Sequence, residues 1–136
     1  MHSWQVPASM AILVWGVWGF VSKLATKHLS PHAVVVFQGL GNVLIALAVA
    51  ASVRKSLSIH PVGTSLAVLG GICGLGGTLL FLRAIAVGDA VVVVPFTAMY
   101  PLVTVVLCAV FLREPLTGAH ILGIILALAA VALLST

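Results

Sequence analysis

Residues 79–133 read LLFLRAIAVGDAVVVVPFTAMYPLVTVVLCAVFLREPLTGAHILGIILALAAVAL, and this stretch decides the fold class. It contains the end of one apolar run and two complete ones, broken only by Gly88 with Asp89 and by Arg113 through Pro115. The complete runs approach the roughly 20 residues that cross a bilayer as a helix. They are continuous rather than alternating, which disfavours the strands of a transmembrane barrel. The stretch therefore predicts membrane helices joined by tight turns.

The composition of the whole chain supports the same conclusion. Of its 136 residues, 62% are hydrophobic and 6% are charged, whereas an ordinary soluble domain is about 25% charged. So few polar side chains cannot cover a globule in water, and lipid is the expected solvent. The formal charge of +4 comes from basic residues at the ends of apolar runs, which favours anchoring at lipid headgroups over nucleic-acid binding. These basic residues are Lys23, Lys27, Arg54, Lys55, Arg83 and Arg113.

The chain is predicted to be one all-α membrane domain, residues 1–136, with a bundle of about five transmembrane helices. Ser30 and Pro31 can open the second helix, the first as a cap and the second in the first turn. Asp89 is the expected cap of the fourth. Short loops make sequential helices antiparallel neighbours. We expect the helices at about 6–27, 31–53, 61–87, 90–112 and 116–134.

The third apolar run is rich in glycine. Gly70 and Gly74 are four residues apart, with three further glycines beside them. Glycines at this spacing let two helix backbones approach closely. Packing within the chain, a dimer contact and a flexible gate all remain possible interpretations.

Two prolines, Pro95 and Pro101, interrupt the fourth run. Each lacks an N–H, so each frees a carbonyl one turn earlier and can kink the helix. Such a kink serves a moving transporter but is also common in static bundles.

Polar and aromatic side chains inside the apolar runs are the candidates for a binding site. A polar group at mid-bilayer is costly unless it faces a partner or a cavity. The two amides on the second helix share a face, and the two tryptophans of the first lie three residues apart. We expect a central pocket with aromatic walls; alternatively, the tryptophans face lipid and the amides only join helices. The candidate substrate-binding residues are Trp15, Trp18, Gln38, Asn42, Thr97 and Tyr100.

Nothing in the sequence supports catalytic, cofactor-binding or metal-binding residues. The only acids, Asp89 and Glu114, fall at helix ends, which argues against proton-for-cation exchange through a buried carboxylate. His28 and His32 are four residues apart, but the break before the second helix separates them, so a metal site is not expected. No nucleophile with a base, and no phosphate-binding loop, is found. The protein is therefore not expected to be an enzyme.

Glu114 is expected to have a structural role. It lies in the turn before the fifth helix, next to Arg113 and six residues before His120. It could pair with either of these residues, or cap the fifth helix through its first-turn amides.

The chain resembles the drug/metabolite transporter superfamily, specifically its EamA-like five-helix unit. The segment WGVWGFVSKLA, from Trp15, is similar to the family's tryptophan-glycine start followed by a lysine. Residues 79–133 look like the family's third-to-fifth helix pattern. Where many members carry an arginine, seven residues after the second-helix proline, this chain has Gln38. The residues in familiar places are Arg83, Pro101, Glu114 and Gly123.

This resemblance implies one half of an inverted-repeat transporter, because most members are ten-helix chains built from two such units in opposite orientation. They export amino acids and other small metabolites. A single unit would act as a dimer by alternating access, as a multi-pass protein of the inner (cytoplasmic) membrane, on a small neutral or zwitterionic solute. The related small multidrug-resistance proteins carry a glutamate eight residues before a lysine, and here Trp15 stands there. The open alternatives are a non-transporting structural subunit and a component of a lipid-linked sugar flippase.

The distribution of basic residues predicts insertion in both orientations. Lys and Arg bias in short loops sets orientation, so an equal count on both sides leaves no strong preference. Oppositely inserted copies would form an antiparallel homodimer. The alternative is one fixed orientation, with the Arg54 loop in the cytoplasm and a separately encoded half as partner. Arg54, Lys55 and Arg113 fall on the side of the N-terminus, and Lys23, Lys27 and Arg83 on the other.

Overall fold

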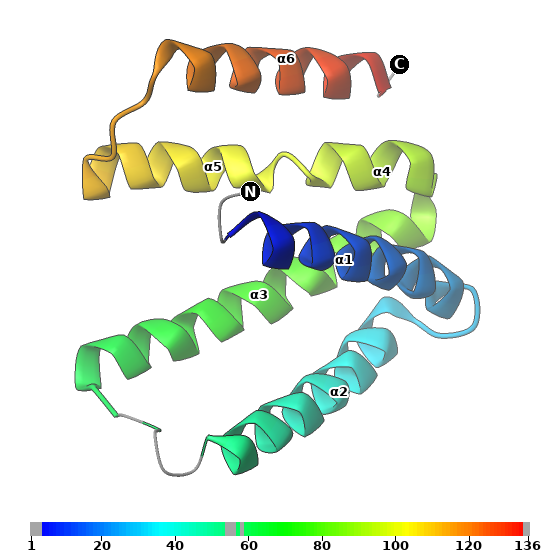
Figure 1. Ribbon diagram of the computed structural model, residues 1–136. Helices are drawn as coiled ribbons and strands as arrows, with labels where there is room; N and C mark the ends of the chain where they lie inside the picture. Colours follow the sequence, from blue (N-terminus) through cyan, green and yellow to red (C-terminus); the bar gives the residue numbers. More distant parts are fainter. Residues whose placement is uncertain (1–3, 54–56, 58, 135–136) are drawn as a thin grey trace. The chain divides into compact units, whose positions relative to one another are not determined.

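All regular secondary structure in the described part of the chain is helical, which confirms the predicted all-α class (Figure 1). The computed structural model describes residues 4–53, 57 and 59–134. Arg54 and Lys55 lie outside the described residues. They are two of the basic residues on which the predicted dual insertion depends. The elements are α1 (Gln5–Thr26), α2 (Pro31–Ser52), α3 (Pro61–Val87), α4 (Ala90–Thr97), α5 (Tyr100–Leu107), the π-helical turn η1 (Cys108–Leu112) and α6 (Gly118–Leu134).

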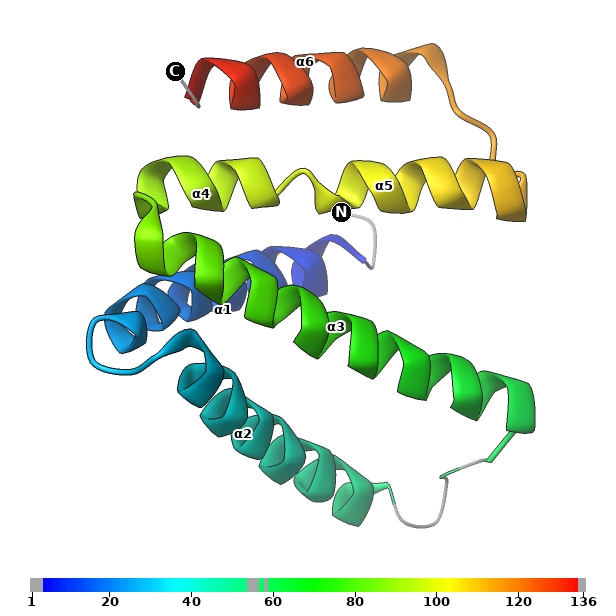
Figure 2. The ribbon, with the colours of Figure 1, turned by 180° about the vertical axis from the view of Figure 1, so that it is seen from behind.

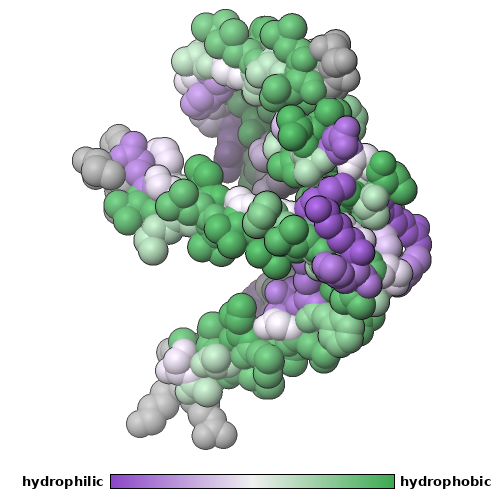
Figure 3. All heavy atoms as spheres, turned by 90° about the vertical axis from the view of Figure 1, so that its right-hand side faces the viewer, coloured by the Kyte–Doolittle hydropathy of each residue, from purple (hydrophilic) through white to green (hydrophobic). Residues whose placement is uncertain are grey.

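Four helical segments of the described chain are long and apolar enough to cross a membrane: α1, α2, α3 and the run Ala90–Leu112. The shorter apolar helix α6 has 17 residues. Large apolar side chains cover most of the face seen in Figure 3, and Leu13, for example, is 71% exposed. Exposing such a side chain to water costs about 1.5–3 kcal/mol. Lipid removes that cost, so these surfaces fit a multi-pass membrane protein.

Residues 1–86 form one compact unit. Its helices come together where α1 ends, α2 begins and α3 ends, and they diverge at their other ends (Figures 1 and 2). The buried residues gather at the converging ends, because only there do three helices surround a side chain. Ser30 caps α2 as predicted, since its side chain accepts a hydrogen bond from the Ala33 N–H. The buried residues are Gly19, Ser22, Val34, Leu82 and Ile85.

Residues 87–136 form a second compact unit. The fourth predicted span is not one continuous helix there, because α4 ends at Thr97 and α5 begins at Tyr100 (Figure 1). Pro101 provides the physical reason: it has no N–H to donate to the Thr97 carbonyl. Pro95, by contrast, lies inside α4 without ending it. Asp89 occupies the cap position of α4, but its side chain makes no capping hydrogen bond.

In the second unit, Arg113 follows η1 and has a strained backbone conformation. Its φ of 56° and ψ of 33° lie in the left-handed region. An L-residue with a Cβ pays about 1–2 kcal/mol for this conformation, and glycine avoids it. The Arg113 N–H donates to the Cys108 carbonyl, so the left-handed residue closes the π-helical turn.

We expect Arg113→Gly to be more stable than Arg113→Ala by about 1 kcal/mol. Both variants remove the charge, so their difference in stability reports the backbone strain, less the extra backbone entropy that glycine loses on folding. The free energy of unfolding, measured by SDS titration in mixed micelles, checks this. Equal stability of the two variants would contradict the strain.

Candidate functional site

The contact between Gln38 and Ser22 is the centre of the candidate site in the first unit. Gln38 Nε2 of α2 donates to Ser22 Oγ of α1 over 2.9 Å, and Ser22 is fully buried. The Oε1 atom of Gln38 is also buried, and no described residue donates to it. Turning the amide by 180° would still leave one polar atom without a partner. A buried unsatisfied polar group costs about 1–3 kcal/mol, so this atom suits a donor from a bound solute or water.

Trp18 provides an aromatic wall one turn before Ser22 on α1. Its ring stacks on Phe81 of α3, with the ring centroids 5.2 Å apart and the planes at 26°. The sequence offered no signal for Phe81, which is one of many apolar residues in its run. Trp15 is 59% exposed and Trp18 is 37% exposed. The stacked Trp18 is therefore better placed than Trp15 to form a wall of the candidate site.

Asn42 lies one turn beyond Gln38 on α2, as the sequence predicted, and is exposed. Its side chain forms no hydrogen bond with the described residues. Asn42 therefore does not join helices within the described part of the first unit, and its role in binding stays a prediction.

Lys23 joins α1 to the end of α3. Its Nζ donates to the Ile85 carbonyl over 2.6 Å. Ile85 is among the last four residues of α3, whose carbonyls have no partner within the helix. A cation at a helix C-terminus is also favoured by the helix dipole. Lys23 therefore caps α3, and is more than the headgroup anchor that the sequence suggested.

Arg83 joins α3 to α2. Its Nη2 donates to His32 Nε2 over 2.8 Å. Together with the Gln38–Ser22 and Lys23–Ile85 hydrogen bonds, this bond links α1, α2 and α3 to one another at the converging ends. The sequence did not predict the pair, although one signal exists: Arg83 lies four residues inside the end of α3, deep enough to need a partner.

The remaining predicted residues, Thr97 and Tyr100, flank the break between α4 and α5 in the second unit. Thr97 Oγ1 donates to the carbonyls of Val93 and Val94, over 2.8 and 3.0 Å. Tyr100 is 60% exposed. Thr97 and Tyr100 thus lie at the two ends of the break, and in the first unit Gln38 contacts α1 at Ser22, one turn after Trp18. That all six predicted residues line one pocket stays a prediction.

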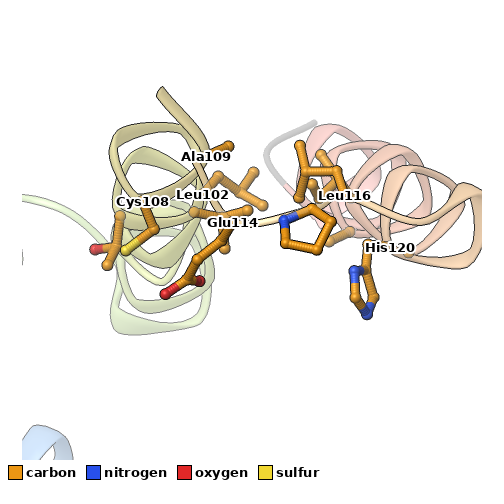
Figure 4. Close-up of a pocket in the computed structure, with 12 residues that line it drawn as sticks. Leu102, Cys108, Ala109, Glu114, Leu116 and His120 are labelled. Carbon is orange, nitrogen blue, oxygen red and sulfur yellow. The ribbon is translucent and has the colours of Figure 1, made fainter. Parts of the chain in front are cut away.

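A groove of about 460 Å³ lies in the second unit, between α6 and the segment formed by α5 and η1. Its walls are mainly apolar, and Figure 4 shows the Glu114 carboxylate and the His120 ring projecting to the same side. None of the six predicted residues lines it. The residues lining this groove include Leu102, Cys108, Ala109, Glu114, Leu116 and His120.

The expected role of Glu114 is not seen in the described contacts. No described residue forms a hydrogen bond or ion pair with its carboxylate. Thr117 caps α6 instead: Thr117 Oγ1 accepts from the His120 N–H over 3.3 Å. In return, the Thr117 N–H donates to His120 Nδ1 over 3.4 Å. This reciprocal cap explains why α6 begins at Gly118 and not at the predicted Leu116.

Among the described residues, no three His, Cys, Asp or Glu side chains are grouped so that they could hold a metal ion. Of His28 and His32, the pair considered from the sequence, His32 accepts a hydrogen bond from Arg83.

Apolar spans joined by a few polar contacts define the class of this molecule as a helical, multi-pass membrane protein. The chain belongs to the EamA-like transporter family, whose model matches residues 3–136. The family is part of the drug/metabolite transporter superfamily, and its members are transporters of small solutes, not enzymes.

One relative is an uncharacterized protein of Methanocaldococcus jannaschii, 25% identical over 126 residues. The similarity covers 93% of this chain and 91% of the relative, so the two chains have similar lengths. No solved structure matches the chain.

We expect Lys23→Met to lower the free energy of unfolding by about 1–3 kcal/mol, because it leaves the Ile85 carbonyl without its donor. Lys27→Met is the matched control, since Lys27 lies at the exposed end of α1 and its side chain makes no bond to the described residues. SDS titration of both variants checks this. Equal losses of unfolding free energy in the two variants would mean that the Lys23 cap contributes no more to stability than a basic charge at the end of α1.

Proposed function

We propose that this chain transports a small neutral or zwitterionic metabolite by alternating access, as a dimer, with export as its direction. Membership of the EamA-like family carries the proposal. The ten-helix members that it resembles combine two inverted units, and this chain supplies one. We place the protein in the inner (cytoplasmic) membrane.

Gln38 is the strongest candidate within the proposed substrate site. Its buried Oε1 has no described donor, while its Nε2 is held by Ser22. A solute with an N–H or O–H group would satisfy that oxygen and be oriented by it. Trp18, braced by Phe81, would provide an apolar wall beside it. The proposed substrate-binding residues remain Trp15, Trp18, Gln38, Asn42, Thr97 and Tyr100.

The proposed dimer is an antiparallel pair of identical chains. The equal count of basic residues on the two sides supports it. The glycines of α3 support a close helix contact: a Cβ built on Gly70, Gly71 or Gly74 would meet no described atom within 4 Å apart from its chain neighbours and the nearby backbone of α3 itself. These positions leave a face of α3 open to the backbone of another helix.

We expect Gln38→Ala to reduce transport about tenfold or more, because it removes the free oxygen. Ser22→Ala is the matched control: it removes the same bond between α1 and α2 but keeps the Gln38 amide, and should retain most activity. Counterflow of a panel of radiolabelled amino acids in proteoliposomes measures both. Unchanged counterflow in Gln38→Ala would remove this residue from the site.

Dual insertion predicts that each loop can be reached from both sides of the membrane. Single cysteines would replace Leu57 and His28, which lie in loops on opposite sides, in a variant lacking Cys73 and Cys108. With an impermeant maleimide on intact cells, about half of each cysteine should react before permeabilisation. Labelling of one position only would establish a fixed orientation and exclude the antiparallel homodimer.

A further inference from the structure

The fourth span is interrupted at Ala98 and Met99, inside an apolar segment that runs from Ala90 to Leu112. Eight helical residues precede the break, and at 1.5 Å each they place it about 12 Å along the span. A hydrocarbon core is about 30 Å thick. The break therefore lies well inside the membrane, where backbone polar groups need partners.

Two carbonyls at this break have no donor among the described residues. The helical donor for the Thr97 carbonyl would be residue 101, which is a proline. The helical donor for the Ala98 carbonyl would be the Leu102 N–H, which donates to the Met99 carbonyl instead, over 2.9 Å. No other described backbone donor reaches either oxygen.

The two carbonyls favour a cation over an anion. At the start of α5, Pro101 has no N–H and the Leu102 N–H donates to the Met99 carbonyl, so neither residue offers a donor to an anion. The end of α4 contributes two adjacent carbonyls, which carry the negative end of its helix dipole.

The charge of the ligand follows from the acids of the chain. Asp89 precedes α4 and Glu114 follows η1, so both carboxylates lie at the ends of the span and neither lies at the break. A site of neutral oxygens suits a monovalent cation, because divalent ions are usually held by carboxylates. Unwound backbone carbonyls in membrane spans bind monovalent cations in this way.

We propose that the carbonyls of Thr97 and Ala98 bind a small monovalent cationic group, which is a sodium ion or the ammonium group of the transported solute. The proposal rests on the proposed transport function for its biological role. Cation binding itself is measured without transport, so the two can fail separately.

The test is thermal unfolding of the purified protein in nanodiscs, in sodium, methylammonium or choline chloride at equal ionic strength. Choline is a cation with no N–H group. A Tm higher by about 2–4 °C in sodium than in choline identifies an ion site. The same rise in methylammonium alone identifies a site for a substrate amine. No rise in either salt overturns the proposal.

Two proline variants test the location. Pro101→Ala supplies an N–H that can donate to the Thr97 carbonyl, so we expect it to close the break and abolish the Tm rise. Pro95→Ala makes the same change inside α4, away from the break, and should keep the rise. An undiminished rise in Pro101→Ala overturns the location. If that variant does not fold, the comparison of salts on the natural chain decides whether a cation binds.

Counterflow in proteoliposomes separates the two proposals. A cation-specific Tm rise without counterflow of any amino acid would count against transport and leave the site standing. Counterflow without a Tm rise would leave transport standing and reject the cation site.

Discussion

The first unit depends on the bond between Lys23 Nζ and the Ile85 carbonyl. In lipid, apolar surfaces gain little from meeting one another, so polar contacts and close packing must hold helices together. Lys23 needs an acceptor because it lies inside the membrane end of α1, and the end of α3 has carbonyls without donors. The bond removes the free-energy cost of leaving either group without a partner in the membrane. It thereby holds α1 against the end of α3.

That point determines where the unit is rigid. The Gln38 contact with Ser22 and the stacking of Trp18 on Phe81 lie at the same converging ends. The opposite ends of α2 and α3 diverge from α1 (Figure 2), and the hydrogen bonds between helices of the described unit lie at the converging ends. A unit fixed at one end and open at the other can rock about the fixed end. The alternating access that we propose for this chain would use movement of this kind.

The spans could be predicted from the sequence because they depend on local signals: apolar runs, the Ser30 cap and Pro31 at the start of α2. The break after Thr97 was signalled only as a kink, since the sequence contains two prolines and does not distinguish which one ends a helix. The contacts between helices were not predictable. Lys23 and Ile85 are 62 residues apart, and no periodicity relates them. Gln38 was found because an amide in an apolar run needs a partner, but Ser22 could not be assigned as that partner.

Both proposed binding sites rest on polar atoms that have no donor among the described residues: Gln38 Oε1 in the first unit and the Thr97 and Ala98 carbonyls in the second. In water such atoms would be solvated at little cost, whereas inside a membrane they are costly. A subunit that only packs against other proteins gains nothing from keeping them unsatisfied, because apolar residues and a continuous helix would be more stable. A transporter must instead offer polar atoms to a solute that enters and leaves. The unsatisfied atoms therefore favour transport over a purely structural role.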